Sequence, residues 1–155
     1  MNHTCMHLKE QKYLGIQTKV LFADHDETDF RQLQVDVLRA GIANIDFSEH
    51  FLALDSDFSE ESFCYTPLVP VTAFEGEGFF RFTRAEGDYY CFEVTLKELG
   101  PQWFQACFAY MEQHDLKIDH AFDLEFYPLG YMEKLVNETF ALTDQTICLI
   151  FRKAD

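Results

Sequence analysis

The segment whose side chains could do the most chemistry is Asp123-Leu124-Glu125-Phe126-Tyr127, which carries two carboxylates and a phenol. Because side chains alternate along a strand, Asp123, Glu125 and Tyr127 would share one face of it. If that face meets water, the segment is an ordinary half-exposed edge strand. If it faces a cavity, the acids could bind a cation, or one of them could act as a general base. The segment alone leaves both interpretations open.

Aromatic residues are abundant, with 17 Phe, 7 Tyr and 1 Trp making up 16% of the chain. Many of these rings must build the core, since each buries a large apolar area. Rings that remain could line a cavity, where rings and carboxylates together suit flat cations. Trp103, Tyr65 and Tyr90 are candidate cavity walls that could equally belong to the core. Tyr90 shares its strand face with Phe92 and Val94, which indicates that it points inward.

Other kinds of chemistry have no motif to support them. The 6 His lack metal-ligand spacing, and the 5 Cys include no CxxC pair and are odd in number. The sequence has neither a P-loop nor a GxGxxG motif. We therefore expect no metal, no cofactor and no nucleotide site, and thiols that stay reduced, as is typical of a cytoplasmic protein.

The chain is strongly acidic, with 12 Lys and Arg against 27 Asp and Glu and a net charge of −15. Nucleic acids and anionic membranes are bound by neutralising phosphates with basic side chains, so neither is an expected partner. No apolar run is long enough to span a bilayer, and the N-terminus lacks the apolar region of a signal peptide. Cationic partners are favoured.

Hydrophobic periodicity positions these residues on alternating strands and helices. Strands are predicted over residues 12–22, 50–54, 63–72, 79–83, 89–96, 121–127 and 146–152. One helix is expected to begin with a capping box at Asp24 and to end near Gly41, a second to begin at Pro101, and a short third to span residues 131–136. The segments 79–83 and 89–96 are expected to form a hairpin. Pro67 and Pro70 indicate that residues 63–72 form an edge strand or an irregular one.

The order strand, helix, strand, strand occurs twice, over about residues 12–72 and 79–153. Two such units predict an α+β fold, with one antiparallel sheet and two helices on it. Neither half alone would bury both sides of its helix. We therefore expect residues 1–155 to form a single domain.

Six features of the sequence, taken in order, resemble the GyrI-like domain, which is also the effector-binding domain of many AraC- and MerR-type bacterial regulators. They are the first strand with Gly15, the helix with Phe30 and Leu33 that ends in Ala40-Gly41-Ile42, the strand into Pro70-Val71, the turn Glu86-Gly87-Asp88-Tyr89, the helix from Trp103-Phe104-Gln105, and the strand Leu124-Glu125-Phe126-Tyr127. The resemblance extends from about Tyr13 to Arg152, and it rests on the order and spacing of these features.

The resemblance implies two pseudo-symmetric β-α-β-β repeats that form a curved antiparallel eight-stranded sheet with two long helices. It also implies an aromatic-lined cavity in which Glu125, at the position of the family's Glu-x-Tyr strand, is the buried counter-ion of cationic, lipophilic compounds. No helix-turn-helix region precedes Tyr13, so we expect a stand-alone module, with a transcriptional regulator or another protein as an open partner. The stretch 130–144 is longer than the family pattern, which leaves the cavity mouth undefined.

Together these observations predict a stand-alone binding module for lipophilic cationic aromatic compounds, with catalysis less favoured than binding. Glu125 would be the counter-ion, Trp103, Tyr90 and Tyr65 the stacking walls, and Tyr127 a nearby hydroxyl. The resemblance also leaves two alternatives. One is a hydrolase of electrophilic small molecules with Glu125 as the general base, and the other is a protein-interaction module that antagonises gyrase or a toxin.

Overall fold

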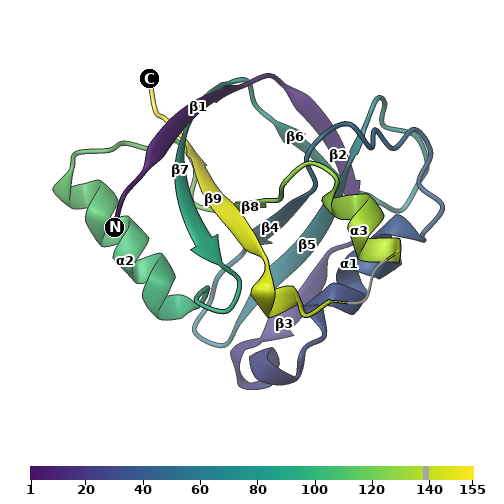
Figure 1. Ribbon diagram of the computed structural model, residues 1–155, viewed down its shortest axis with the longest axis horizontal. Coiled ribbons are helices and arrows are strands. Elements are labelled where there is room, and N and C mark those ends of the chain that lie inside the picture. The colour runs from purple at the N-terminus through teal and green to yellow at the C-terminus, as the bar shows by residue number, and fades with distance from the viewer. Residues whose placement is uncertain (138–139) are drawn as a thin grey trace.

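The computed structural model describes residues 1–137 and 140–155, and their strands form one antiparallel sheet in the order β1-β7-β9-β8-β4-β5-β2-β6, with β3 beside β5 (Figure 1). The strands are β1 (Thr4–Leu8), β2 (Gln11–Gly15), β3 (Thr18–Leu21), β4 (Leu52–Ser56), β5 (Ser62–Val71), β6 (Phe80–Arg84), β7 (Gly87–Thr95), β8 (Asp123–Phe126) and β9 (Thr146–Arg152). The helices are α1 (Phe30–Leu38), α2 (Pro101–Gln113) and α3 (Tyr131–Asn137), with 3₁₀ turns η1 (Phe22–Glu27) and η2 (Leu142–Asp144).

The first predicted strand is present but interrupted. Both β2 and β3 pair with the same edge of β5, and Ile16 and Gln17 separate them. Counted as one strand, they give eight strands in the described chain. The predicted α+β class, with a curved antiparallel sheet, is confirmed.

The sheet is pseudo-symmetric, because β2–β3, α1, β4 and β5 in one half correspond to β7, α2, β8 and β9 in the other, with β4 beside β8 at the centre. The outermost strands are exchanged: β1 pairs with β7, and β6 pairs with β2. One register runs through both pairs, from Leu8 opposite Gly87 to Gln11 opposite Arg84. The predicted hairpin is therefore wrong, because the link at Ala85 and Glu86 joins two consecutive strands rather than reversing the chain.

The interior position of β5 excludes one of the two predicted alternatives, the edge strand. β5 pairs with β4 on one edge and with β2 and β3 on the other, although Pro67 and Pro70 lie in it. Pro67 lies opposite the break between β3 and β2, and Pro70 lies beyond Leu68, where pairing with β4 ends. Each proline thus occupies a stretch where one edge of the strand has no ladder, so its missing N–H is tolerated.

Helix α1 begins later than predicted. Residues 22–27 form the 3₁₀ turn η1, and the N-cap of α1 is Asp29, whose side chain accepts a hydrogen bond from the Gln32 amide at 3.0 Å. The expected capping box at Asp24 is wrong, because the Thr28 hydroxyl binds the Asp24 carbonyl within the turn. Gly41 follows the helix with φ of 84°, as expected of a glycine that ends a helix.

Two apolar clusters cover the two faces of the sheet. One face carries the larger cluster, on which α1, α2 and α3 pack. This face is called the cavity face below. The opposite face carries Tyr13, Leu54, Leu124, Phe126 and their neighbours. In Figure 1, α2 lies to the left of the strands, and α1 and α3 lie together on the right. None of the helices in the described part of the chain is long and apolar enough to cross a membrane. The predicted helix at residues 131–136 is α3. It belongs to the stretch 130–144, whose residues 138–139 lie outside the described residues.

Candidate ligand-binding site

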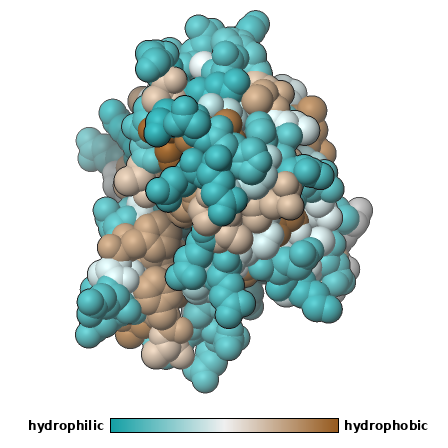
Figure 2. Space-filling view, turned by 90° about the vertical axis from the view of Figure 1, so that its left-hand side faces the viewer, coloured by the Kyte–Doolittle hydropathy of each residue, from teal (hydrophilic) through white to brown (hydrophobic). Residues whose placement is uncertain are grey.

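A cavity of about 830 Å³ lies over β4, β5 and β8, between η1 on one side and the first turns of α2 on the other. Its volume falls within the range of about 300–1,000 Å³ that is usual for small-molecule sites. On the side of the molecule where α2 lies, apolar side chains gather among hydrophilic ones (Figure 2). The opening of the cavity is framed by segments from both halves of the chain.

Phe and Tyr rings form a large part of the cavity wall. They come from η1, α1, β5, α2, the loop before β5 and the residue after β8, and they are Phe22, Phe30, Phe58, Phe63, Tyr65, Phe104, Phe108 and Tyr127. Phe58 and Phe22 each stack on Phe63, with ring centroids 5.8 and 5.6 Å apart. Phe22, Phe58 and Phe108 remain exposed. Flat apolar surfaces are therefore available to a ligand from more than one direction.

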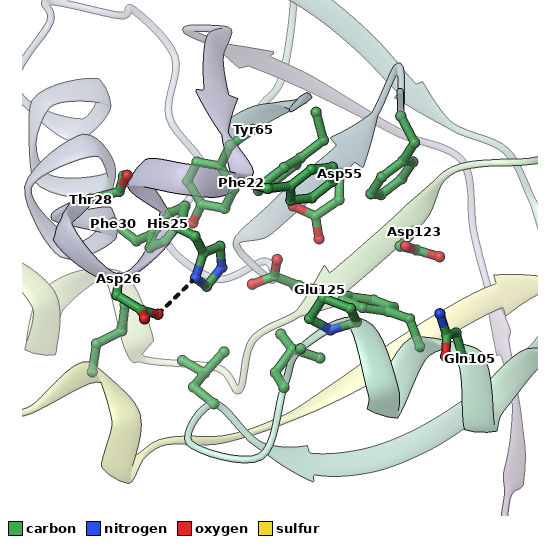
Figure 3. Close-up of a pocket in the computed structure, with 18 of the residues that line it drawn as sticks. Phe22, His25, Asp26, Thr28, Phe30, Asp55, Tyr65, Gln105, Asp123 and Glu125 are labelled. Carbon is green, nitrogen blue, oxygen red and sulfur yellow. Dashed lines mark ion pairs between the residues drawn. The ribbon is translucent and has the colours of Figure 1, made fainter. Parts of the chain in front are cut away.

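Three carboxylates occupy the floor of the cavity. Asp123 and Glu125 lie on the same face of β8, and Asp55 of β4 is directly opposite Asp123 in the sheet. The exposed fractions of Asp123, Glu125 and Asp55 are 2%, 5% and 4%. Figure 3 shows Glu125 at the centre of the cavity, with Asp55 beside it and Asp123 toward Gln105 of α2. The interpretation of this strand as a half-exposed edge strand, with its acids in water, is therefore wrong.

Burial shifts all three acids toward their protonated forms. It raises the pKa of Asp123 to about 7, with the negative Glu125 as a second cause. Burial also raises the pKa of Asp55 and of Glu125, which are hydrogen-bonded to each other. That hydrogen bond raises the pKa of Asp55 and lowers the pKa of Glu125. This hydrogen bond therefore favours the proton on Asp55 and the charge on Glu125.

A buried amide orders the hydroxyls around Glu125. The Gln34 side chain, on α1, donates to the Tyr65 hydroxyl at 2.8 Å and to the Tyr127 hydroxyl at 3.0 Å, and accepts from Tyr131 at 2.5 Å. Tyr127 in turn donates to Oε1 of Glu125 at 2.8 Å. With both amide hydrogens and its oxygen in use, Gln34 fixes the rings, and these fix the carboxylate.

His25 is the basic side chain that faces Glu125. It lies on η1 against Phe30, with ring centroids 5.2 Å apart, and its Nδ1 is 3.6 Å from the Asp26 carboxylate. Its positive form lowers the pKa of Glu125, although burial of Glu125 has the larger effect. Among the described residues, no Lys or Arg lines the cavity. Nor do those residues include a group of three or more His, Cys, Asp and Glu that could hold a metal ion.

The structure brings together three of the five residues named from the sequence. Glu125, Tyr65 and Tyr127 line the cavity, whereas Trp103 and Tyr90 are not among the described residues that line it. Trp103 packs edge-on against Phe92 in the core, with centroids 6.4 Å apart. Tyr90 lies under the Lys153 amine, which is 5.0 Å from its ring centroid.

Sequence reasoning missed several residues of the site. Asp55 ends the apolar run Leu52-Ala53-Leu54, and the strand was predicted to stop at Leu54. A charged residue that continues such a run was the available signal. Gln34 lies four residues after Phe30 and three before Val37, so it is a polar residue in the middle of an apolar helix face. For His25 there was no signal, since a solvated acidic segment was the simplest interpretation.

Comparisons with known proteins identify the fold. No protein-family model matches this sequence. No curated protein matches it either. Among solved structures, SAV2435 bound to tetraphenylphosphonium is similar over 100% of this chain and 94% of its own, with 17% identity and a TM-score of 0.59.

Two further structures share the same architecture. A protein from Staphylococcus aureus MU50, described as a bacterial transcription regulation protein, is 16% identical over 99% of this chain and 97% of its own, with a TM-score of 0.54. EcmrR, solved in a complex with DNA, is 12% identical with a TM-score of 0.68, and this chain spans 58% of its length. At these identities the likeness shows the fold alone, and that fold is the one implied by the resemblance to GyrI-like domains.

Proposed function

We propose that this chain is a binding module for lipophilic, cationic, aromatic small molecules, with Glu125 as their counter-ion. The observation that carries the proposal is the position of this carboxylate, 5% exposed, on the floor of an open aromatic cavity. Its charge is held by a hydrogen bond from Tyr127 and faces His25, without a Lys or Arg among the described lining residues.

The physical basis of the affinity is compensation of a buried charge. An ionised carboxylate among rings is unfavourable unless a positive group approaches it. A delocalised aromatic cation can approach Glu125 and stack on Phe22 or Phe104 at the same time. A charge-assisted contact contributes about 1.5–3 kcal/mol, and the ring contacts contribute more. Micromolar affinity, about −8 kcal/mol, is within reach of such a ligand.

The wall of the proposed site differs from the one expected on sequence. Tyr65 stays as a wall and Tyr127 as the hydroxyl that positions Glu125. Phe22 and Phe104 take the stacking roles first given to Trp103 and Tyr90, which lie elsewhere.

The structural neighbours support this class of ligand. SAV2435 was solved with tetraphenylphosphonium, a lipophilic cation, and EcmrR with DNA. The net charge of −15 disfavours direct contact with DNA. Where this module takes part in regulation, we therefore assign DNA contact to a partner and ligand recognition to this chain.

The test compares three phenyl-substituted ligands that differ in charge. Tetraphenylphosphonium, neutral triphenylphosphine oxide and anionic tetraphenylborate are titrated against the protein by isothermal calorimetry. We expect the cation to bind at least tenfold more tightly than the neutral compound, and the anion not to bind. Glu125→Gln should weaken the cation tenfold or more, about 1.4 kcal/mol. Glu77→Gln, which removes one charge from an exposed loop, should not weaken it.

Equal binding of all three compounds to the wild type would refute the proposal, as would a Glu125→Gln variant that binds the cation as tightly as wild type. Catalysis is the specific alternative, because a raised pKa also suits Glu125 as a general base on a bound water. Turnover of an epoxide or another electrophile, lost in Glu125→Gln, would favour it. A binder returns its ligand unchanged.

A further inference from the structure

The cavity holds more acid than one monovalent cation can balance. Asp123 and Glu125 are two residues apart on one face of β8, which separates their backbone positions by about 6–7 Å. Glu125 is hydrogen-bonded to Asp55, and burial together with this bond raises the pKa of Asp55, which favours a single negative charge on the pair. Asp123 is a second acid outside that pair. A ligand with a single charge on Glu125 would leave Asp123 without a counter-ion.

The two aspartates are also short of hydrogen bonds. Oδ1 of Asp123 and Oδ2 of Asp55 are buried and have no hydrogen-bond partner, and both residues line the cavity. A buried polar atom without a hydrogen-bond partner destabilises the protein. Glu125 differs, since Tyr127 donates to it. The unpartnered oxygens therefore lie on the cavity floor at Asp123 of β8 and at Asp55 of β4, and not at Glu125.

Within residues 1–137 and 140–155, no side chain of opposite charge forms an ion pair with Asp123. Around it are Glu125 on its own strand, Asp55 on β4, and Cys107 of α2, whose thiol pKa is raised by burial and by Asp123. The Gln105 side chain of α2 lines the same end of the cavity. His25 is on the far side, near Glu125 (Figure 3).

We infer that the cavity is matched to an aromatic dication, with one cationic group on Glu125 and a second, N–H-bearing group such as an amidinium or ammonium on Asp123. This inference rests on the proposed function and narrows its ligand class. The second group needs N–H donors, because the unpartnered Asp123 and Asp55 oxygens accept hydrogen bonds. Two groups at the para positions of one benzene ring have about the required separation, and the ring between them can stack on Phe104.

The experiment uses matched aryl ligands on the full chain. A para-substituted aryl bis-amidine is compared by calorimetry with the analogue in which one amidine is a neutral carboxamide. We expect the wild type to prefer the bis-amidine by tenfold or more. Asp123→Asn should reduce that preference to about threefold or less and leave the mono-amidine within about twofold of wild type. Glu125→Gln should weaken both compounds.

Each outcome decides a different point. If the wild type binds both amidines equally, or if Asp123→Asn keeps the full preference, the dication inference is wrong. If tetraphenylphosphonium binds in the same experiment, the proposed function survives that result. If none of the three cations binds, the proposed function itself has failed. Glu77→Gln is the control for loss of one surface charge, and thermal unfolding checks that each variant folds.

Discussion

Two buried charges on opposite faces of the sheet show how differently this molecule treats ionised side chains. Arg84, 2% exposed, donates to the Tyr13 hydroxyl at 2.9 Å and to the Lys9 carbonyl at 3.1 Å, and lies over the Tyr13 and Phe126 rings. Its guanidinium is 4.0 Å from Glu49. On the cavity face Glu125 has one hydroxyl donor, a hydrogen bond to the neighbouring acid Asp55, and open space above it.

The contrast separates structural from functional burial. Arg84 has two hydrogen-bond acceptors, two rings and the Glu49 carboxylate around its charge, although its buried Nε has no hydrogen-bond partner, so its removal harms the fold. A charge with incomplete compensation beside a cavity destabilises the empty protein and is compensated when a ligand arrives. Phe126 and Glu125 are adjacent on β8, so one strand contributes to both environments through its two faces.

The largest expected effect is on stability, when the enclosed charge of Arg84 is removed. Arg84→Ala removes the donors to Tyr13 and Lys9 and leaves a buried void, so the free energy of unfolding should fall by about 3 kcal/mol or more. Urea unfolding measures this. Arg81→Ala on the same strand, exposed and over the Phe74 ring, is the matched control and should cost well under 1 kcal/mol. A loss of tetraphenylphosphonium binding with stability unchanged would contradict the assignment of Arg84 to structure.

The next effect is the pH dependence of the protein's stability that comes from the acids in the cavity. Asp123 has a pKa of about 7 in the folded protein against an ordinary value of 3.8, so folding favours its protonated form. Below about pH 4 both states hold the proton; the free energy of unfolding then falls as the pH rises to about 7 and levels off above it. Glu125 and Asp55, which face Asp123, shift in the same direction.

Asp123→Asn should remove its share of this slope. At pH 8 the variant should therefore be more stable than wild type, by on the order of 2 kcal/mol, while at pH 4 the two should nearly coincide. Urea titrations at a series of pH values measure the difference. A variant that is less stable at pH 8 than wild type would show that Asp123 is compensated in the empty protein, as Arg84 is.

A third prediction compares two neighbouring rings on α2. Phe104 lines the cavity and Trp103 packs against Phe92 in the core. Phe104→Ala should weaken tetraphenylphosphonium and triphenylphosphine oxide alike, by roughly tenfold, because stacking area is lost for either. Trp103→Ala should lower the melting temperature and leave both affinities nearly unchanged. The reverse result would return Trp103 to the role expected on sequence.

The sequence predicted the elements better than it predicted their partners. The strand at residues 146–152 and the start of α2 at Pro101 were correct because periodicity and proline act locally. The false hairpin arose because local turn residues around Gly87 cannot show that β6 pairs with β2, which is distant in the chain. Pro67 was misplaced for the same reason, since the break in the facing strand that accommodates it is a tertiary feature.

The same distinction between local and tertiary information applies to the candidate site. Strand alternation placed Glu125 and Tyr127 on one face, and the structure places both in the cavity. Asp55 and Gln34 reach Glu125 only through strand pairing and helix packing, so no spacing within one segment revealed them. The rings could not be assigned from their type alone, because Trp103 and Phe104 are equally apolar and only the direction of each side chain from α2 separates core from wall.

The smallest expected effect isolates the hydrogen bond that holds Glu125. Tyr127 and Tyr65 both accept from the Gln34 amide, but Tyr127 also donates to the Glu125 carboxylate. Tyr127→Phe should therefore raise the pKa of Glu125 and weaken tetraphenylphosphonium at pH 7 by about threefold, whereas neutral triphenylphosphine oxide should not respond. Tyr65→Phe is the matched control, because it loses the same bond to Gln34 and leaves the donor to Glu125 in place. If the two variants weaken the cation equally, the effect comes from the Gln34 network as a whole. The Tyr127 hydroxyl would then have no separate part in keeping Glu125 charged.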